Sequence, residues 1–187
     1  ERKLFETDQE FESIVPSSVL AKVKSVIPEK LDEIEILIND NQIQFMVGDI
    51  LVISNLIDGK YVEYRRLIPD KTETTVKISR TDFYQIAKVA KVFSDKSGGS
   101  VKITANEETS KLSMHTIASE IGENTSEADA EIQGGGEVTL NVNYIENALK
   151  PLNSSKIYFG FSGKLAPTIF KNTDSYDYIH IVMPLKS

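Results

Sequence analysis

One pattern recurs three times along this chain: a helix with a single apolar face, followed by three turn-linked strands. The expected helix caps, Ser17, Ser79 and Asn143, follow one another at intervals of roughly sixty residues. Each copy has an open sheet and a one-faced helix, so it cannot enclose a core alone. Two copies paired about a pseudo-twofold axis would form a domain. Three copies therefore predict one complete domain and, at the N-terminus, half of another whose remainder precedes this chain.

Apolar periodicity places the elements of each copy. Val23, Phe83 and Ile145 each belong to a set of apolar residues on one helical face, and period-two runs indicate the strands. The strands are expected at 11–16, 34–38, 42–47, 50–57, 74–78, 101–105, 111–119, around 128–132, 137–142, 156–162, 167–172 and 178–183. Short turns join them, so neighbouring strands run antiparallel and the fold class is α+β. The acidic, Gly-rich stretch 120–137 is expected to be a solvated loop around its one strand.

The composition is that of a globular protein with a negative charge. At 40% hydrophobic residues the chain can bury a core, and its net charge is −7. No apolar run approaches the roughly 18 residues that a membrane span needs, so no membrane segment is expected. The absence of cysteine excludes disulfides and thiolate metal sites and fits a cytoplasmic protein. An acidic chain can bind nucleic acid only where its cations are locally concentrated.

Signatures of catalysis, cofactor binding and metal binding are missing from the sequence. It contains none of the glycine motifs that bind phosphates or dinucleotides or that present a nucleophilic serine. His115 and His180 lie in separate strand patterns without acids at ligand spacing, so they are better explained as ordinary strand residues than as metal ligands or bases. Asp49 and Asp58 each stand next to a glycine and are typical of turns. We expect no enzymatic activity, no cofactor and no metal.

The expected helices carry cations on the face opposite the apolar one. These are Lys22 and Lys24 in the first helix, Arg80, Lys88, Lys91 and Lys96 in or after the second, and Lys150 after the third. Acids concentrate instead in loops and strands. Cationic helices on an acidic protein can contact phosphates without reading bases, which gives weak, salt-sensitive binding. A solvated helix face is the simpler alternative, and the charges alone favour it.

The C-terminal residues 180–187, HIVMPLKS, place a run of apolar side chains at a chain end. Met and Pro suit a shallow, adaptable peptide-binding surface. An edge strand that completes a sheet explains the same residues equally well, and both interpretations can hold.

Four stretches of the sequence are similar to the bacterial DNA polymerase III beta subunit family, the replicative sliding clamps. They are Val47–Pro69, in which 56–69 also reads as a connector between domains, NVNYIENALKPL at 141–152, FSGKLAP at 161–167 and VMP at 182–184. The resemblance covers nearly the whole chain. It implies the DNA clamp fold, with repeated βαβββ units and helices on the inner face. It also implies two domains, with the second half of the middle clamp domain at 1–63 and the C-terminal clamp domain at 64–187.

The resemblance further implies a processivity factor without catalytic activity. Proteins of this family form a head-to-tail homodimeric ring around duplex DNA, independently of its sequence. They tether DNA polymerase III, the clamp loader and repair polymerases, which bind through a short peptide motif. The helix cations would then face the DNA. A protein-binding module of similar sheet architecture without a DNA role is the alternative.

The ring interface of the family matches Val92 and Phe93 of this chain. The partner surface belongs to the first clamp domain, which this sequence does not contain. The chain alone is therefore expected to be monomeric or to form a non-native contact.

The family's peptide-binding groove lies between the middle and last domains. Its positions match Leu4, Arg66, Leu67, Asn141, Tyr144, Leu165, Pro167, Ile181, Val182, Met183, Pro184 and Leu185. Apolar anchors would supply most of the affinity for an extended peptide with a Gln and terminal apolar side chains. Relatives often have a bulky residue where this chain has Gly98 and Gly99, which predicts a more open pocket.

Overall fold

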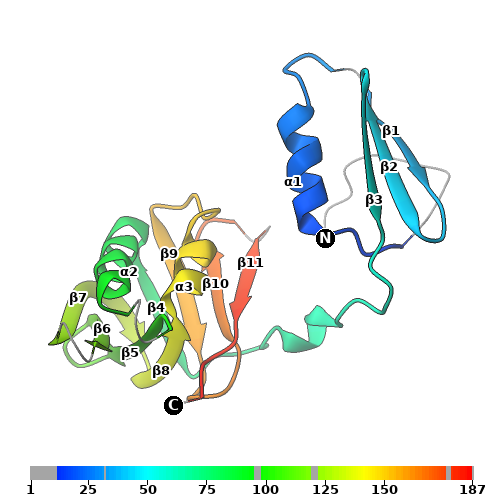
Figure 1. Ribbon diagram of the computed structural model, residues 1–187. Coiled ribbons are helices and arrows are strands. Elements are labelled where there is room, and N and C mark those ends of the chain that lie inside the picture. Colours follow the sequence, from blue (N-terminus) through cyan, green and yellow to red (C-terminus); the bar gives the residue numbers. More distant parts are fainter. Residues whose placement is uncertain (1–11, 32, 95–97, 119–121, 176–177, 187) are drawn as a thin grey trace. The chain divides into compact units, whose positions relative to one another are not determined.

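The computed structural model describes residues 12–31, 33–94, 98–118, 122–175 and 178–186. The chain forms two compact units, Glu1–Val62 and Glu63–Ser187 (Figure 1). The division falls within the predicted connector, immediately before the short 3-10 helix η1 (Tyr64–Leu67).

The first unit is one helix packed on a three-stranded antiparallel sheet (Figure 1). The elements are helix α1 (Ser17–Val26) and strands β1 (Glu35–Ile38), β2 (Gln42–Val47) and β3 (Ile50–Asn55), in the sheet order β1-β2-β3. Alternation along β2 points Ile43, Phe45 and Val47 to one face, where they are buried together with Val23 of α1. One apolar helix face therefore covers one apolar sheet face.

The start of this unit differs from the prediction in two ways. Of the strand expected at 11–16, the described part contributes a single antiparallel bridge, between Ile14 and Ile57. The expected cap Ser17 is wrong: Pro16 holds the N-cap position, and no side chain caps the helix there. A proline has no N–H and keeps its own φ near −65°, so the chain enters the helix directly after it and Ser17 is the first helical residue.

The second unit is built from two copies of a βαβββ motif. The first copy contains β4 (Thr74–Ser79), α2 (Arg80–Ser94), β5 (Ser100–Asn106), β6 (Lys111–Ala118) and β7 (Gly122–Gln133). The second contains β8 (Gly136–Asn141), α3 (Val142–Leu149), β9 (Lys156–Phe161), β10 (Thr168–Asn172) and β11 (Ile179–Val182). The α+β class is confirmed.

The first strand of each copy pairs with a strand of the other copy. The sheet order is β11-β10-β9-β4-β7-β6-β5-β8, and every pairing is antiparallel. Strand β4 of the first copy thus pairs with β9 of the second, and β8 of the second pairs with β5 of the first. This reciprocal pairing is the contact expected of two copies related by a pseudo-twofold axis, although β4 also pairs with β7 of its own copy while β8 lies at the sheet edge. Neither copy can complete its sheet without the other.

Helices α2 and α3 lie side by side over one face of this sheet (Figure 1). Beneath them Phe83, Phe159, Phe161 and Phe170 form a fully buried aromatic cluster whose neighbouring ring centroids are 4.7 to 6.0 Å apart. Such distances allow tilted and offset ring contacts. The cluster joins α2 to strands β9 and β10, and therefore joins the two copies of the motif.

The acidic stretch predicted as a loop is largely a strand. Strand β7 runs from Gly122 to Gln133, and its exposed positions carry Glu123, Glu127 and Asp129. These acids stand at alternate residues, so all of them lie on the outer face of the strand. On the neighbouring strand β6, Lys111 pairs with Glu127 (3.6 Å) and Asp129 (3.9 Å). The composition of this stretch alone is typical of a loop. In the structure it forms a strand, and ion pairs to the neighbouring strand offset part of its negative charge.

Candidate functional site

The C-terminal tail is held on both sides by hydrogen bonds to the second unit. The Thr168 hydroxyl, at the start of β10, donates to the carbonyl oxygen of Val182 (2.9 Å). The Leu185 N–H donates to the carbonyl oxygen of Thr139 in β8 (2.8 Å). Strand β11 is therefore an edge strand, as one interpretation expected, and its extension runs beside β8. Val182 is buried there, whereas Met183 is 52% exposed.

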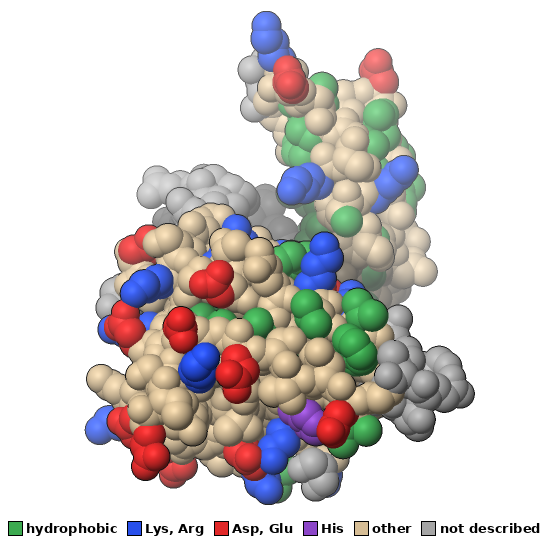
Figure 2. Space-filling view, turned by 90° about the vertical axis from the view of Figure 1, so that its left-hand side faces the viewer, with side chains coloured by type: hydrophobic (Ala, Val, Ile, Leu, Met, Phe, Trp, Pro, Cys, Tyr) green, Lys and Arg blue, Asp and Glu red, His purple; other side chains and the backbone are tan. Residues whose placement is uncertain are grey.

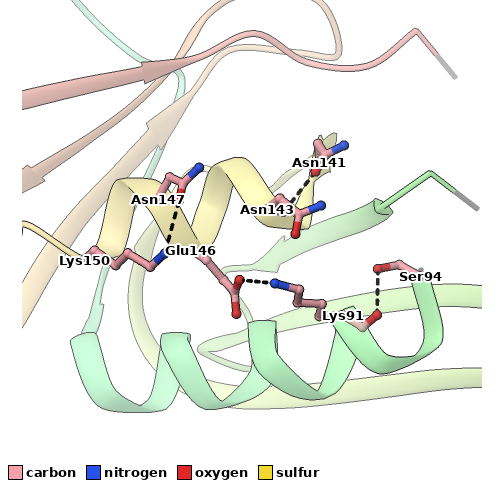
Figure 3. Close-up of polar contacts among 7 residues, drawn as sticks. All are labelled: Lys91, Ser94, Asn141, Asn143, Glu146, Asn147 and Lys150. Carbon is pink, nitrogen blue, oxygen red and sulfur yellow. Dashed lines mark hydrogen bonds and ion pairs between the residues drawn. The ribbon is translucent and has the colours of Figure 1, made fainter. Parts of the chain in front are cut away.

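Asn141 links the end of β8 to the start of α3 and to the turn after α2. Its Oδ1 accepts a hydrogen bond from the N–H of Asn143 (2.9 Å), which caps the helix (Figure 3). Its Nδ2 donates to the carbonyl oxygen of Gly98 (2.9 Å). The predicted cap, Asn143, is wrong by two residues. A Cβ at Gly99 would lie 2.9 Å from the Asn141 Oδ1, so the small residue makes room for this side chain.

Replacing Asn141 by Ala is expected to lower the free energy of unfolding of the second unit by about 1–2 kcal/mol, because the helix cap and the bond to Gly98 are both lost. Asn143→Ala is the matched control, since Asn143 is exposed and its backbone N–H, not its side chain, makes the cap bond. Urea unfolding followed by circular dichroism measures both changes. Equal effects from the two variants would contradict the assignment of Asn141 as the cap.

Three apolar side chains around this tail and helix are exposed. Tyr144 in the first turn of α3 is 54% exposed, Leu165 between β9 and β10 is 63% exposed, and Met183 follows β11. Pro167, Ile181, Pro184 and Leu185 are partly buried. Helix α3 contacts β11, and β10 pairs with β11, so these exposed side chains lie on or beside adjoining elements, which favours a binding surface. The structure thus brings most of the predicted groove residues onto adjoining elements.

The remaining groove predictions lie elsewhere in the chain. Arg66 and Leu67 are on η1, where Leu67 is 40% exposed and the Arg66 side chain pairs with Glu63 (2.6 Å). Leu4 lies outside the described residues.

The predicted helix cations differ in their surroundings. Lys22 and Lys24 are exposed on α1 of the first unit, and Lys88 is exposed on α2. Arg80 and Lys150 meet where α2 begins and α3 ends, and with Thr81 and Tyr84 they line a cavity of about 310 Å³. The guanidinium of Arg80 donates to the carbonyl oxygen of Leu149 (3.5 Å). Two cations and two hydroxyls at one cavity form a suitable place for an anion. Lys96 lies outside the described residues.

Among the predicted helix cations that the structure describes, Lys91 differs from the rest because it pairs with an acid. Its Nζ lies 2.6 Å from Oε2 of Glu146, and the Glu146 side chain is only 11% exposed (Figure 3). The pair joins α2 to α3, and the loss of one partner would leave a charge in a poorly solvated place. Sequence reasoning missed this role because the two residues are 55 positions apart.

The outer face of the second unit mixes charges of both signs, as Figure 2 shows for the side that it displays. Lys102 lies 2.8 Å from Glu137, and its hydrogen bond holds the pKa of that carboxyl below its usual value. Lys156 lowers the pKa of Glu131 in the same way, at 2.6 Å. Paired charges on this face leave little net positive potential for a nucleic acid.

Both histidines lie in strands, as predicted. His115 on β6 lies 3.4 Å from Glu123 on the neighbouring strand β7, eight positions away in the sequence. His180 on β11 places Nδ1 2.8 Å from the Tyr178 hydroxyl, and burial lowers the pKa of this histidine. Among the described residues, no three His, Asp or Glu side chains are arranged to hold a metal.

The residues predicted for the ring interface lie on α2, where Val92 is 65% exposed and Phe93 is partly buried.

None of the described helices combines the length and the apolar character that crossing a membrane requires.

The family model for the DNA polymerase III beta subunit, C-terminal domain, matches residues 65–186, which is most of the chain. The chain belongs to the DNA polymerase III beta subunit family. The family predicted from the four sequence motifs is thereby confirmed.

Relatives and solved structures agree with this membership. The beta sliding clamp of Staphylococcus epidermidis is 28% identical over 93% of this chain and 46% of its own length. A DNA polymerase III beta chain structure from Streptococcus pneumoniae is 26% identical, with a TM-score of 0.87 over 100% of this chain and 50% of that one. The Bacillus subtilis sliding clamp structure gives a TM-score of 0.85 at 21% identity, covering 98% and 49%. The clamp fold is confirmed, and the chain spans about half the length of the relatives it matches.

Proposed function

We propose that this chain is the C-terminal part of a DNA sliding clamp, the processivity factor that tethers a replicative polymerase to duplex DNA. Residues 1–63 would be the second half of the middle clamp domain and residues 64–187 the complete last domain. The observation that carries the proposal is the family match over 65–186, together with the pairing of each βαβββ copy's first strand with a strand of the other copy. The complete protein would be a cytoplasmic homodimeric ring without catalytic activity.

The peptide-binding surface would be formed by the tail and the start of α3. Tyr144, Leu165 and Met183 expose apolar side chains there, while hydrogen bonds from Thr168 and Leu185 hold the backbone of the tail in place. A preordered surface of this kind binds an extended peptide with little loss of its own conformational entropy. The occupants would be short motifs of DNA polymerase III, the clamp loader and repair polymerases.

Contact with DNA would come from helix cations, of which Lys22, Lys24, Lys88 and Lys150 are exposed and Arg80 is partly buried. Lys22, Lys24, Lys88, Arg80 and Lys150 are available for phosphate contacts, and contacts to phosphates alone leave the clamp free to slide because they read no base. Lys91 would contribute less to DNA binding, because its charge is paired with that of Glu146.

A peptide titration tests the proposed binding surface. A peptide containing Gln and a terminal Leu-Phe pair, added to the isotope-labelled chain, is expected to shift amide resonances at Tyr144, Leu165 and Met183. Tyr144→Ala should weaken binding about thirtyfold, equivalent to ~2 kcal/mol, as expected for an aromatic anchor. Ile117→Ala is the control, because Ile117 is similarly exposed but lies on β6. Shifts confined to other regions, or equal losses from both variants, would refute the assignment.

A further inference from the structure

The first unit exposes apolar side chains on the sheet face that α1 does not cover. Directly opposed residues on neighbouring strands share a face, and Gln44 opposes both Leu37 and Ile53, while Met46 opposes Leu51. None of these belongs to the set of residues that pack against α1. The exposed fractions are 55% for Leu37, 37% for Met46, 47% for Leu51 and 52% for Ile53. These four side chains form one contiguous group, called here the outer apolar face.

The same face of the second unit has a different chemistry. Strands β5, β6 and β7 follow α2 as β1, β2 and β3 follow α1, so their outward positions correspond. Those positions carry Lys102 and Thr104 on β5, Lys111, Ser113 and His115 on β6, and Glu127 and Asp129 on β7, with Ile117 of β6 as a single exposed apolar residue. An outward sheet face of this protein can therefore be charged and solvated. The outer apolar face of the first unit is a local departure that the fold does not require.

The described strands and hairpin turns that form the outer apolar face, residues 35–55, carry three acids and no Lys or Arg. Residues 31–59 contain six carboxylates and no Lys or Arg. Glu35 stands on the face itself, opposite Met46. Asp40 and Asp49 are exposed in the two hairpin turns, at opposite ends of the strands. An apolar surface that has carboxylates at both ends favours a ligand with an apolar centre and cationic flanks.

We propose that the outer apolar face is a docking surface for a basic amphipathic protein segment, with apolar side chains toward the sheet and Lys or Arg at its borders. DNA and anionic membranes would be repelled by the same carboxylates. A second copy would bring two sets of carboxylates together, in a chain whose net charge is −7. Met46 adds a side chain that adapts to differently shaped apolar ligands. The site is separate from the proposed peptide surface, which belongs to the second unit.

An amphipathic helical peptide made of Leu and Lys, and a matched peptide made of Leu and Glu, test the proposal. The Lys peptide is expected to shift the amide resonances of Leu37, Met46, Leu51 and Ile53 in the isotope-labelled chain. Its binding should weaken as NaCl is raised toward about 1 M, because the charges are then screened over ~3 Å. Ile53→Lys should weaken binding about tenfold or more by placing a cation at the centre of the face. Leu51→Gln is the second variant, should Ile53→Lys fail to fold.

Ile117→Lys is the matched control, because it places the same charge on an equally exposed apolar residue of the second unit. It is expected to leave binding of the Lys peptide unchanged. Equal binding of the Glu peptide, or equal loss from Ile117→Lys and Ile53→Lys, would overturn the proposal. Self-association in sedimentation that Ile53→Lys abolishes would identify a second copy as the occupant instead. Binding to phosphatidylserine vesicles that Ile53→Lys leaves intact or strengthens would point to a membrane, and would equally overturn it.

Discussion

Gly134→Ala is expected to destabilise the second unit by at least about 4 kcal/mol, which places it among the most damaging single substitutions. Gly134 joins β7 to β8 with φ at +72°, and an added Cβ would lie 2.2 Å from the backbone carbonyl oxygen of Glu73. A carbonyl oxygen of the main chain cannot rotate away as a flexible side chain can. The turn would have to separate from the start of β4, so the sheet would lose contact at its centre. Thermal and urea unfolding followed by circular dichroism measure the change.

Gly163→Ala separates this clash from the cost of the backbone conformation alone. Gly163 has φ at +60° in the turn between β9 and β10, and its added Cβ would meet no atom within 4 Å. Its substitution should therefore cost only the left-handed strain, about 1–2 kcal/mol. If both variants lost the same stability, the close approach to Glu73 would not be the cause.

Patterns that depend on neighbouring residues were predictable from the sequence. The threefold repeat, the α+β class and the helix faces follow from periods of 3.6 and two residues, which survive whatever packs against them. Helix caps were less predictable, because several polar residues stand near each helix start and only the backbone geometry selects one. The sequence offered Asn141 and Asn143 at the third helix, and the structure uses Asn141.

Features that depend on distant residues could not be predicted in the same way. The pairing of Lys91 with Glu146 and the hydrogen bond from Leu185 to Thr139 join separate elements. The strand character of 122–133 depends on β6, whose Lys111 stands opposite Asp129. A composition rule assigns such an acidic stretch to a loop, because it cannot take account of a partner strand. For the proposed peptide surface, the family resemblance predicted the tail and Tyr144, and the structure supplied the hydrogen bonds that hold the tail.

The pairing of β8 with the other copy connects the fold to the proposed peptide surface. Strand β8 belongs to the second copy but lies at the sheet edge beside β5 of the first. It carries Thr139, which holds the tail, and ends at Asn141, which caps α3. The exposed side chains of Tyr144 and Met183 are therefore placed by a strand that the other copy anchors. If the strand pairing between the copies is lost, this surface should lose its order more readily than the strands that pair within one copy.

Phe159→Ala is the second substitution for which we expect a large effect, a loss of about 3–5 kcal/mol from the free energy of unfolding. Phe159 is fully buried on β9, and its ring centroid lies 4.7 Å from that of Phe170, 5.3 Å from Phe161 and 5.5 Å from Phe83. Removal of the ring leaves a cavity between the two copies that these surrounding rings cannot collapse to fill. Urea unfolding followed by circular dichroism gives the magnitude.

Leu165→Ala is the control for Phe159→Ala, because Leu165 is 63% exposed and should change stability by no more than about 0.5 kcal/mol. The two variants are also expected to act on opposite properties. Phe159→Ala should lower stability while leaving the peptide affinity of the folded fraction nearly unchanged, and Leu165→Ala should lower affinity while leaving stability unchanged. Loss of a fully buried ring from a close-packed core must lower stability if that ring holds the two copies together. A Phe159→Ala variant as stable as the parent chain would therefore show that the aromatic cluster does not hold them together.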